Sequence, residues 1–328
     1  MPDTVPLSHV LPPPAAPSGL SLVLGAGGFL GGHVASWLAR SGARARLFDL
    51  SVESIPAAVR RAPGIEVVHG NLMDDAVLRR ALEGVDRVFH FVSATVPATS
   101  IDDVALELRA NVEPMNRLLE AMRAAGVGLV VFPSSGGTMY GDEAPARGTP
   151  ESAPTSPRGT YGLGKRLVEE ILQFRARAGG PHHLIVRIAN AYGPTVHSHH
   201  RQGVINAFLE CVRAGEPVRL WGDGSAVRDF VHTDDLVAAI AALVAAGERD
   251  EIFNLGSGEG ASVREVLALI GEVVGRPVAT EAMPGAYAGV RRNVLDVGKL
   301  KARVGWKPQV ALRDGIAHLW RAMGGHAG

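Results

Sequence analysis

Short apolar runs alternate with helix-length segments along the first 190 or so residues of the chain. Several of the runs are continuously apolar, which is typical of strands that are covered by helices on both faces. The predicted strands are Leu20–Leu24, Ala45–Asp49, Ile65–His69, Arg87–Val92, Gly128–Phe132 and Leu184–Ile188. The predicted helices between them are Leu30–Ser41, Val104–Ala125 and Tyr161–Ala178. This alternation predicts an α/β fold, a doubly wound parallel sheet with crossover helices.

After Ile188 the alternation weakens, which indicates a smaller C-terminal lobe. Its predicted helices, near Val204–Ala214, Asp234–Ala246 and Val263–Val274, are separated by loops containing Gly and Pro. One further strand, Glu251–Leu255, is expected to return to the main sheet. We therefore assign residues 19–190 and about 228–258 to the sheet domain, and about 191–227 and 259–328 to the lobe. Residues 1–18, rich in proline and without the pattern of a signal peptide, are expected to form a mobile tail.

The charge balance excludes a strong overall attraction to nucleic acid or to an anionic membrane. Lys and Arg total 33, as do Asp and Glu, so any anion site must be local. No apolar run reaches the roughly 20 residues that cross a bilayer, and neither partner is expected. A single cysteine, Cys211, cannot form an intrachain disulfide, and this suits a cytoplasmic protein.

A glycine-rich turn follows the first strand directly. The segment Gly25–Gly31 has the spacing G-x-x-G-x-x-G and leads into a helix, whose N-terminal amides can bind a pyrophosphate. Asp49, at the end of the second strand, stands 18 residues beyond the last of these glycines, near the spacing at which an acid accepts the ribose hydroxyls of NAD. A Rossmann-type NAD site is therefore predicted, although Arg44 and Arg46 leave a preference for NADP open.

Tyr161 and Lys165 stand four residues apart and therefore share one face of a helix. An adjacent ammonium group and an oxidised nicotinamide would both stabilise a tyrosine phenolate, which could then take a hydroxyl proton. Upstream, the segment Phe132–Gly141 supplies hydroxyl groups at the end of a predicted strand, where a doubly wound sheet binds its ligands. One of these hydroxyls could share in proton transfer.

With these pieces assembled, residues 20–310 resemble the extended short-chain dehydrogenase/reductase family, in particular its members similar to UDP-glucose 4-epimerase. Besides the glycine turn and the Tyr161/Lys165 pair, the resemblance rests on the order of seven segments. They are Val88–His90, Asn111–Val112, Ser134–Gly141, Arg187–Pro194, Gly222–Gly224, Arg228–Phe230 and Phe253–Gly258.

The resemblance implies a role for individual residues of this chain. Tyr161 and Lys165 are the implied catalytic pair, assisted by Ser135 or Thr138. The implied NAD contacts are Gly25, Gly28, Phe29, Leu30, Gly31, Asp49, Asn71, Leu72, Phe91 and Ser93, with Tyr161 and Lys165. The implied nucleotide-sugar contacts are Ser135, Asn190, Arg228, Arg291 and Arg292. The arginines are chemically sensible, because a neutral protein needs a few placed cations to bind a diphosphate.

The chain departs from the family pattern at three places. An acid usually follows the glycine after the third strand, where this chain has Asn71, so adenine recognition can differ. The usual catalytic Ser or Thr falls on Gly136, and Ser135 and Thr138 are the nearest substitutes, in that order of preference. The segment 289–294 lacks the bulky aromatic residue that some epimerases carry near the sugar.

The resemblance implies epimerisation of a nucleotide-sugar, most simply at C4 of a UDP-hexose, through oxidation to a 4-keto intermediate and re-reduction on the other face. A nucleotide-4-keto-sugar reductase of deoxysugar biosynthesis would share the same residues and is the alternative. Gly136 and Gly137 argue against a dehydratase or decarboxylase, which carry acidic residues there. A catalytically dead, redox-sensing binding protein is the third hypothesis.

Two further expectations concern metals and assembly. His197, His199 and His200 are close in sequence, but they lack a nearby carboxylate and fall in a predicted loop, so no metal site is expected. The resemblance implies a homodimer formed through the helices 104–125 and 161–178.

Overall fold

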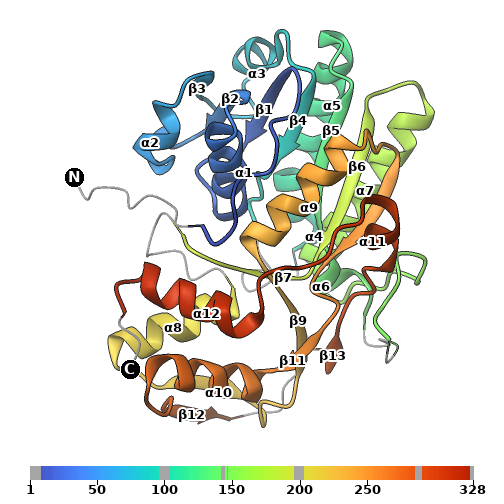
Figure 1. Ribbon diagram of the computed structural model, residues 1–328. Coiled ribbons are helices and arrows are strands. Elements are labelled where there is room, and N and C mark those ends of the chain that lie inside the picture. The colour runs from blue at the N-terminus through green and yellow to red at the C-terminus, as the bar shows by residue number, and fades with distance from the viewer. Residues whose placement is uncertain are drawn as a thin grey trace.

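The computed structural model describes residues 9–95, 103–141, 145, 147–195, 203–284 and 290–325. Its main sheet has seven parallel strands in the order β10-β6-β5-β4-β1-β2-β3 (Figure 1). The strands are β1 (Leu20–Leu24), β2 (Arg44–Asp49), β3 (Ile65–His69), β4 (Arg87–His90), β5 (Leu129–Ser135), β6 (His182–Ile188) and β10 (Glu251–Leu255). The predicted doubly wound sheet is confirmed, and Glu251–Leu255 joins it beside β6.

Helices cover both faces of this sheet, which explains the continuously apolar strands. One face packs against α1, α9 and α11, and the other packs against α3, α5 and α7, each with its own apolar core. The helices of this part are α1 (Phe29–Arg40), α2 (Ala57–Arg60), α3 (Asp75–Leu82), α4 (Val104–Glu107), α5 (Glu113–Ala125), α6 (Gly136–Met139), α7 (Thr160–Arg177), α9 (Thr233–Ala245) and α11 (Gly298–Val304), with a 3₁₀ turn at Val52–Ser54.

The predicted helix Val104–Ala125 is interrupted. A π-helical turn over Leu108–Val112 separates α4 from α5, and Pro114 lies in the first turn of α5. Proline has no backbone N–H to bond the carbonyl of the preceding turn, so an unbroken α-helix is disfavoured at this point. The sequence pattern missed the break because the apolar spacing continues through it.

The lobe lies below the main sheet in Figure 1 and has its own apolar core. A small sheet has the order β11-β9-β13, with β7 also paired to β9, and β12 pairs with β8. The lobe elements are β7 (Asn190–Tyr192), β8 (Val218–Trp221), β9 (Val227–His232), β11 (Gly260–Ser262), β12 (Thr280–Met283), β13 (Arg292–Asn293), α8 (Val204–Ala214), α10 (Val263–Val274) and α12 (Leu312–Ala322). Strand β9 thus belongs to the lobe sheet, whereas the boundary expected from sequence places residues 228–258 with the main sheet.

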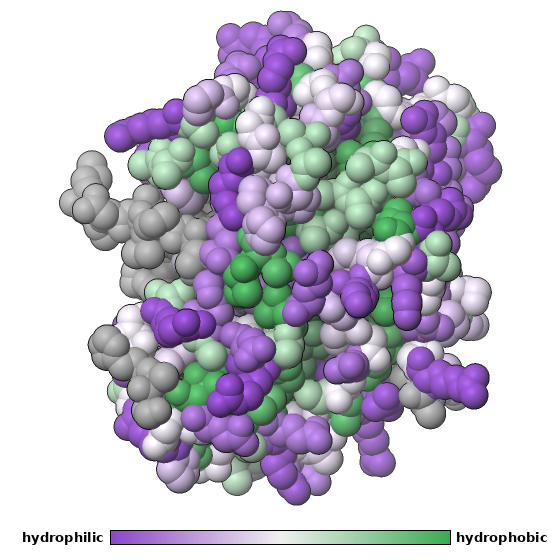
Figure 2. All heavy atoms as spheres, in the orientation of Figure 1, coloured by the Kyte–Doolittle hydropathy of each residue, from purple (hydrophilic) through white to green (hydrophobic). Residues whose placement is uncertain are grey.

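The surface shown in Figure 2 is largely hydrophilic over both parts, with a group of apolar residues between them. Among the described residues, no helix combines the length and the apolar character that crossing a membrane requires.

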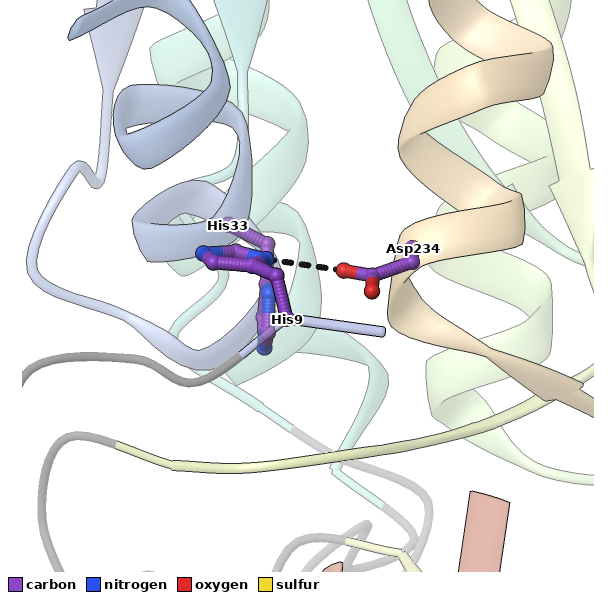
Figure 3. A group of neighbouring side chains, drawn as sticks. All are labelled: His9, His33 and Asp234. Atoms are coloured by element: carbon purple, nitrogen blue, oxygen red, sulfur yellow. Dashed lines mark hydrogen bonds and ion pairs between the residues drawn. The ribbon is translucent and has the colours of Figure 1, made fainter. Parts of the chain in front are cut away.

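The N-terminal segment 9–14 lies against α1 and α9, although the sequence predicts a mobile tail over residues 1–18. The indole of Trp37 donates a hydrogen bond to the carbonyl of Pro14 (3.1 Å), and Arg40 donates to the carbonyl of Leu11 (3.2 Å). His9 lies beside His33 of α1 and Asp234 of α9 (Figure 3). Side chains of the two helices therefore partner backbone groups of a segment whose prolines cannot donate hydrogen bonds.

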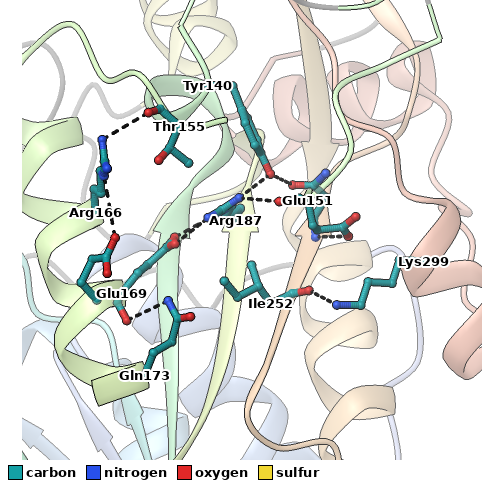
Figure 4. Close-up of polar contacts among 11 residues, drawn as sticks. Tyr140, Glu151, Thr155, Arg166, Glu169, Gln173, Arg187, Ile252 and Lys299 are labelled. Carbon is teal, nitrogen blue, oxygen red and sulfur yellow. Dashed lines mark hydrogen bonds and ion pairs between the residues drawn. The ribbon is translucent and has the colours of Figure 1, made fainter. Parts of the chain in front are cut away.

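A buried polar network holds α7 against the sheet (Figure 4). The guanidinium of Arg187 on β6 donates two hydrogen bonds to the carboxylate of Glu169 on α7 (3.1 and 2.7 Å). It also donates to the Tyr140 hydroxyl (2.9 Å), which in turn donates to the side-chain oxygen of Asn254 on β10 (2.7 Å). Burial raises the pKa of Tyr140 to about 12, so its hydroxyl stays protonated and can donate. The network therefore joins α7 to β6 and β10.

We expect Glu169→Ala to lower the free energy of unfolding by about 3 to 5 kcal/mol, because Arg187 would remain buried without its carboxylate. Urea unfolding followed by circular dichroism measures this loss. Glu170→Ala is the matched control, since Glu170 is exposed and lies 4.0 Å from Arg166. It should change the free energy by less than about 0.5 kcal/mol. Equal losses in the two variants would contradict the assignment.

Candidate active site

The glycine turn between β1 and α1 is tightly packed. Gly25 has a φ of +80°, in the left-handed region that favours glycine, and a Cβ at Gly31 would lie 2.0 Å from the carbonyl oxygen of Gly25. No larger residue therefore fits at position 31. Helix α1 begins at Phe29, so its first amides face the turn and can bind an anion.

Asp49 ends β2 and faces this turn. Its Oδ2 accepts a hydrogen bond from the backbone N–H of Gly27 (2.8 Å), and its Oδ1 accepts one from Ser51 (2.9 Å). A Cβ at Gly27 would lie 3.2 Å from the same carboxylate. The glycine turn and Asp49 are thus joined by a hydrogen bond. The residue that makes it, Gly27, is not one of the three glycines that the G-x-x-G-x-x-G spacing singles out.

The other predicted cofactor contacts follow β3 and β4, the neighbours of β2 and β1. Leu72 is buried, and the side chain of Asn71 accepts a hydrogen bond from the N–H of Met73 (2.9 Å). Phe91 donates its N–H to Leu24 (2.8 Å), and the hydroxyl of Ser93 donates to the carbonyl of Thr95 (2.8 Å). All of these residues lie at the carboxyl ends of adjacent strands, where this fold binds its ligands.

Tyr161 and Lys165 lie together in the first turns of α7. The Nζ atom of Lys165 is 5.6 Å from the centre of the Tyr161 ring and 4.7 Å from that of Phe132. It donates a hydrogen bond to the carbonyl of Pro133 at the end of β5 (2.9 Å). Burial lowers the pKa of Lys165 to about 8, against the opposing effects of Glu107 and Glu169.

Burial, followed by the negative charge of Glu107, raises the pKa of Tyr161 to about 12. The sequence reasoning considered only the two cations that lower this pKa and did not single out Glu107. The Glu107 carboxylate is buried and accepts hydrogen bonds from Thr95 and Asn111 (both 2.8 Å). It packs so closely that a Cβ at Gly164 would lie 2.2 Å from it. Gly164 lies inside a predicted helix, and a glycine in that position was the one feature of the sequence that indicates a close approach by another residue.

The two candidate hydroxyl groups lie at the start of α6 and within it. Ser135 ends β5 and is half buried. The Thr138 hydroxyl is buried without a hydrogen-bond partner in the described part of the chain, and a Cβ at Gly162 would lie 2.8 Å from the Thr138 carbonyl. Thr138 therefore contacts the turn of α7 that carries Tyr161.

Gly136 occupies the position at which the resemblance places a Ser or Thr, and in the structure a side chain there would require Leu295 to move. An added Cβ would lie 2.5 Å from a methyl group of Leu295. Asn293 on β13 donates a hydrogen bond to the carbonyl of Gly136 (3.0 Å), so the lobe contacts α6 directly. Neither Leu295 nor Asn293 was singled out individually from sequence.

Three of the predicted nucleotide-sugar contacts lie on the lobe sheet. Asn190 on β7 pairs in register with Phe230 on β9, and Arg228 on β9 pairs with Asn293 on β13, next to Arg292. The side chain of Asn190 donates to the carbonyl of Asp229 (3.0 Å). Arg291 precedes β13 and is exposed.

Asp229 holds this sheet in place and was named in sequence only as part of a motif. It is fully buried, which raises its pKa, and it accepts hydrogen bonds from the backbone and hydroxyl of Ser257 (both 2.7 Å), from Gly258 (3.1 Å) and from Leu295 (3.3 Å). The histidines at 197, 199 and 200, and residues 285–289, lie outside the described residues.

Known proteins resemble the chain over most of its length. Residues 21–256 match the model of the NAD dependent epimerase/dehydratase family. A UDP-glucose 4-epimerase from Mycolicibacterium smegmatis is 34% identical, over 90% of this chain and 96% of the relative. The crystal structure of a UDP-glucose 4-epimerase from Thermotoga maritima with UDP-glucose is 31% identical, covers 93% of this chain and 98% of its own, and has a TM-score of 0.84.

A UDP-glucose 4-epimerase from Thermus thermophilus, in complex with NAD, is 30% identical, with a TM-score of 0.83 over 94% of this chain and 100% of its own. Reductases and dehydratases of dTDP-sugars also occur among the relatives. The seven-stranded sheet, the glycine turn and these matches agree, and the chain therefore belongs to the NAD dependent epimerase/dehydratase family, as its resemblance to extended short-chain dehydrogenases/reductases implied.

Proposed function

We propose that the chain epimerises a nucleotide-sugar, at C4 of a UDP-hexose, with NAD as its cofactor. The observation that carries the proposal is the half-buried pair of Tyr161 and Lys165 in the first turns of α7, with Lys165 hydrogen-bonded to the end of β5. The named UDP-glucose 4-epimerases among its relatives match nearly the whole chain, including the lobe.

The glycine turn and Asp49 fit the cofactor. The first amides of α1 lie at the end of the turn and suit a pyrophosphate, and the carboxylate of Asp49 suits the ribose hydroxyls of NAD. When bound, NAD would accept a hydride from the sugar carbon and return it. The proposal therefore requires the nicotinamide of NAD to reach the phenol of Tyr161.

Tyr161 would exchange a proton with the sugar hydroxyl, assisted by Ser135 or Thr138. Lys165 keeps its ammonium group within reach of the phenol through its hydrogen bond to Pro133. Because burial and Glu107 raise the pKa of Tyr161, the protein's own residues keep the phenol protonated. Lowering that pKa would fall to Lys165 and to the positive charge of the oxidised cofactor.

The lobe would bind the nucleotide diphosphate. Asn190, Arg228 and Arg292 come from three strands that pair side by side, so they can converge on one ligand. Arginine suits a diphosphate because its guanidinium can bind phosphate oxygens in pairs. Arg291 would supply a further basic contact from the exposed end of β13.

A nucleotide-4-keto-sugar reductase is the second candidate, supported by the dTDP-sugar reductases among the relatives. It would use the same tyrosine, lysine and turn in a single direction. A homodimer through α4, α5 and α7 is also proposed. Exposed apolar side chains on α4 (Val104 and Leu106) and on α7 (Phe174) support that surface.

Incubating the purified protein with UDP-glucose and no added cofactor, and resolving products by proton NMR, tests the proposed reaction. We expect conversion towards the C4 epimer, because retained NAD gives no net redox change. UDP-N-acetylglucosamine, UDP-glucuronate and dTDP-glucose, tested in parallel, would define the sugar and base. Stoichiometric consumption of added NADH with a 4-keto sugar, and no turnover without it, would instead support the reductase.

We expect Asp49→Ala to weaken NAD binding about ten- to a hundredfold, because hydrogen bonds to a charged carboxylate are lost. Its discrimination against NADP should also fall, since the repulsion of a 2′-phosphate is removed. Calorimetric titrations with NAD and with NADP measure the two affinities. Glu53→Ala, at an exposed acid nearby, should leave both affinities unchanged. Unaltered NAD affinity in Asp49→Ala would exclude the assigned role.

We expect Tyr161→Phe to lower kcat by about a hundred- to ten-thousandfold, because the proton-transferring hydroxyl is removed. The NAD content after purification and the circular dichroism spectrum should be retained, since the ring remains buried. Stopped assays over long incubations give the residual rate. A variant that turns over normally would refute a catalytic role for Tyr161.

A further inference from the structure

Three potential metal ligands come together away from the proposed active site. His9 of the N-terminal segment, His33 of α1 and Asp234 of α9 each offer one ligand atom, and these atoms lie within 4.8 Å of one another (Figure 3). The three residues are buried or nearly so: the side chains of His9 and Asp234 are 9% and 5% exposed, and His33 is fully buried. They are far apart in sequence, so only the fold brings them together.

Each of the three side chains is held through its other polar atom. The Nε2 atom of His33 bonds the carbonyl of Pro194 (2.8 Å), and Nε2 of His9 bonds the hydroxyl of Ser36 (2.9 Å). The Oδ2 atom of Asp234 accepts hydrogen bonds from the backbone of residues 10 and 11 (2.5 and 3.0 Å). Metal-binding histidines characteristically have such a second partner, which fixes the ring and its tautomer.

The atoms left over are Nδ1 of His33, Nδ1 of His9 and Oδ1 of Asp234. Because a carbonyl can only accept, Nε2 of His33 carries the proton and its Nδ1 carries a lone pair. That Nδ1 is buried with no hydrogen-bond partner in the described structure. His33 can therefore offer this lone pair to a metal ion.

We propose that His9, His33 and Asp234 form a binding site for one divalent transition-metal ion, with zinc as its best match. Two imidazole nitrogens and one carboxylate oxygen are a donor set that zinc accepts in tetrahedral geometry, with a fourth position left for water. The hydrogen bond between Nδ1 of His9 and Oδ1 of Asp234 (2.8 Å) occupies the site in its absence. Metal binding would replace that hydrogen bond, with the single proton of a neutral His9 ring moving to Nε2, where it can be donated to the Ser36 hydroxyl.

This site would fasten the N-terminal segment to the two helices that cover one face of the main sheet. It does not depend on the proposed reaction, because none of its ligands is assigned to cofactor or substrate. No spacing pattern points to this site, because His9 lies 24 residues from His33 and more than 200 from Asp234. The histidines singled out in sequence, at 197, 199 and 200, are a different set.

Zinc titration of the full-length, chelator-treated protein by calorimetry tests the proposal, with metal analysis after gel filtration. We expect one zinc ion bound per chain and a melting temperature that rises with zinc concentration. His9→Asn should abolish both effects, and circular dichroism checks that this variant keeps the fold. Ser36→Ala, which removes only the second partner of His9, should weaken zinc binding about ten- to a hundredfold.

Two controls separate this site from other histidines. His182→Asn removes an exposed histidine bonded to Asp250 (2.6 Å), and a triple Asn variant removes His197, His199 and His200. Both should bind zinc as the unaltered chain does. The proposal is overturned if the unaltered chain binds no zinc, if His9→Asn binds it equally well, or if the loop variant loses it.

Discussion

The buried contact between Arg187 and Glu169 is the interaction on which the arrangement of the candidate active site depends. Tyr161, Lys165 and Glu169 follow one another at intervals of four residues, so they form one stripe along α7. The last member of the stripe is held to β6 by two charge-assisted hydrogen bonds. Because a helix is stiff over two turns, this anchor also sets where the tyrosine and the lysine lie above the ends of β5 and β6.

The same network connects the two parts of the molecule. Arg187 reaches Asn254 through Tyr140, and the Asn254 side chain donates to the carbonyls of Thr149 and Asp296. Asn293 adds a bond to the carbonyl of Gly136, the first residue of α6, which follows Ser135 and contains Thr138. The lobe strands are therefore positioned relative to α7 by buried hydrogen bonds as well as by apolar packing, and such bonds are demanding in geometry.

Local patterns were sufficient to predict the main sheet. Continuous apolar runs located the strands closely, and the candidate residues Asp49, Tyr161 and Lys165 lie at strand or helix ends that a pattern can identify. Glu107 and Leu295 act through contacts with residues distant in sequence, and nothing in their own neighbourhood marks them. Asp229 stood inside a recognised motif, but its hydrogen bonds to Ser257 and Gly258 could not be read from it. The boundary expected near residue 228 differs from the observed sheets because β9 and β10 follow each other in the chain but pair in different sheets. Likewise, proline content suggested a loose N-terminus, whereas the partners for residues 9–14 come from α1 and α9.

The contact between Gly136 and Leu295 couples two positions that the chain keeps about 160 residues apart. A serine or threonine at 136 would collide with the leucine methyl groups, whereas a smaller residue at 295 by itself would open a cavity beside α6. Each substitution made alone therefore carries a packing cost, and the two costs offset one another when both are made. Introducing a hydroxyl at 136 by design thus calls for a compensated pair of mutations.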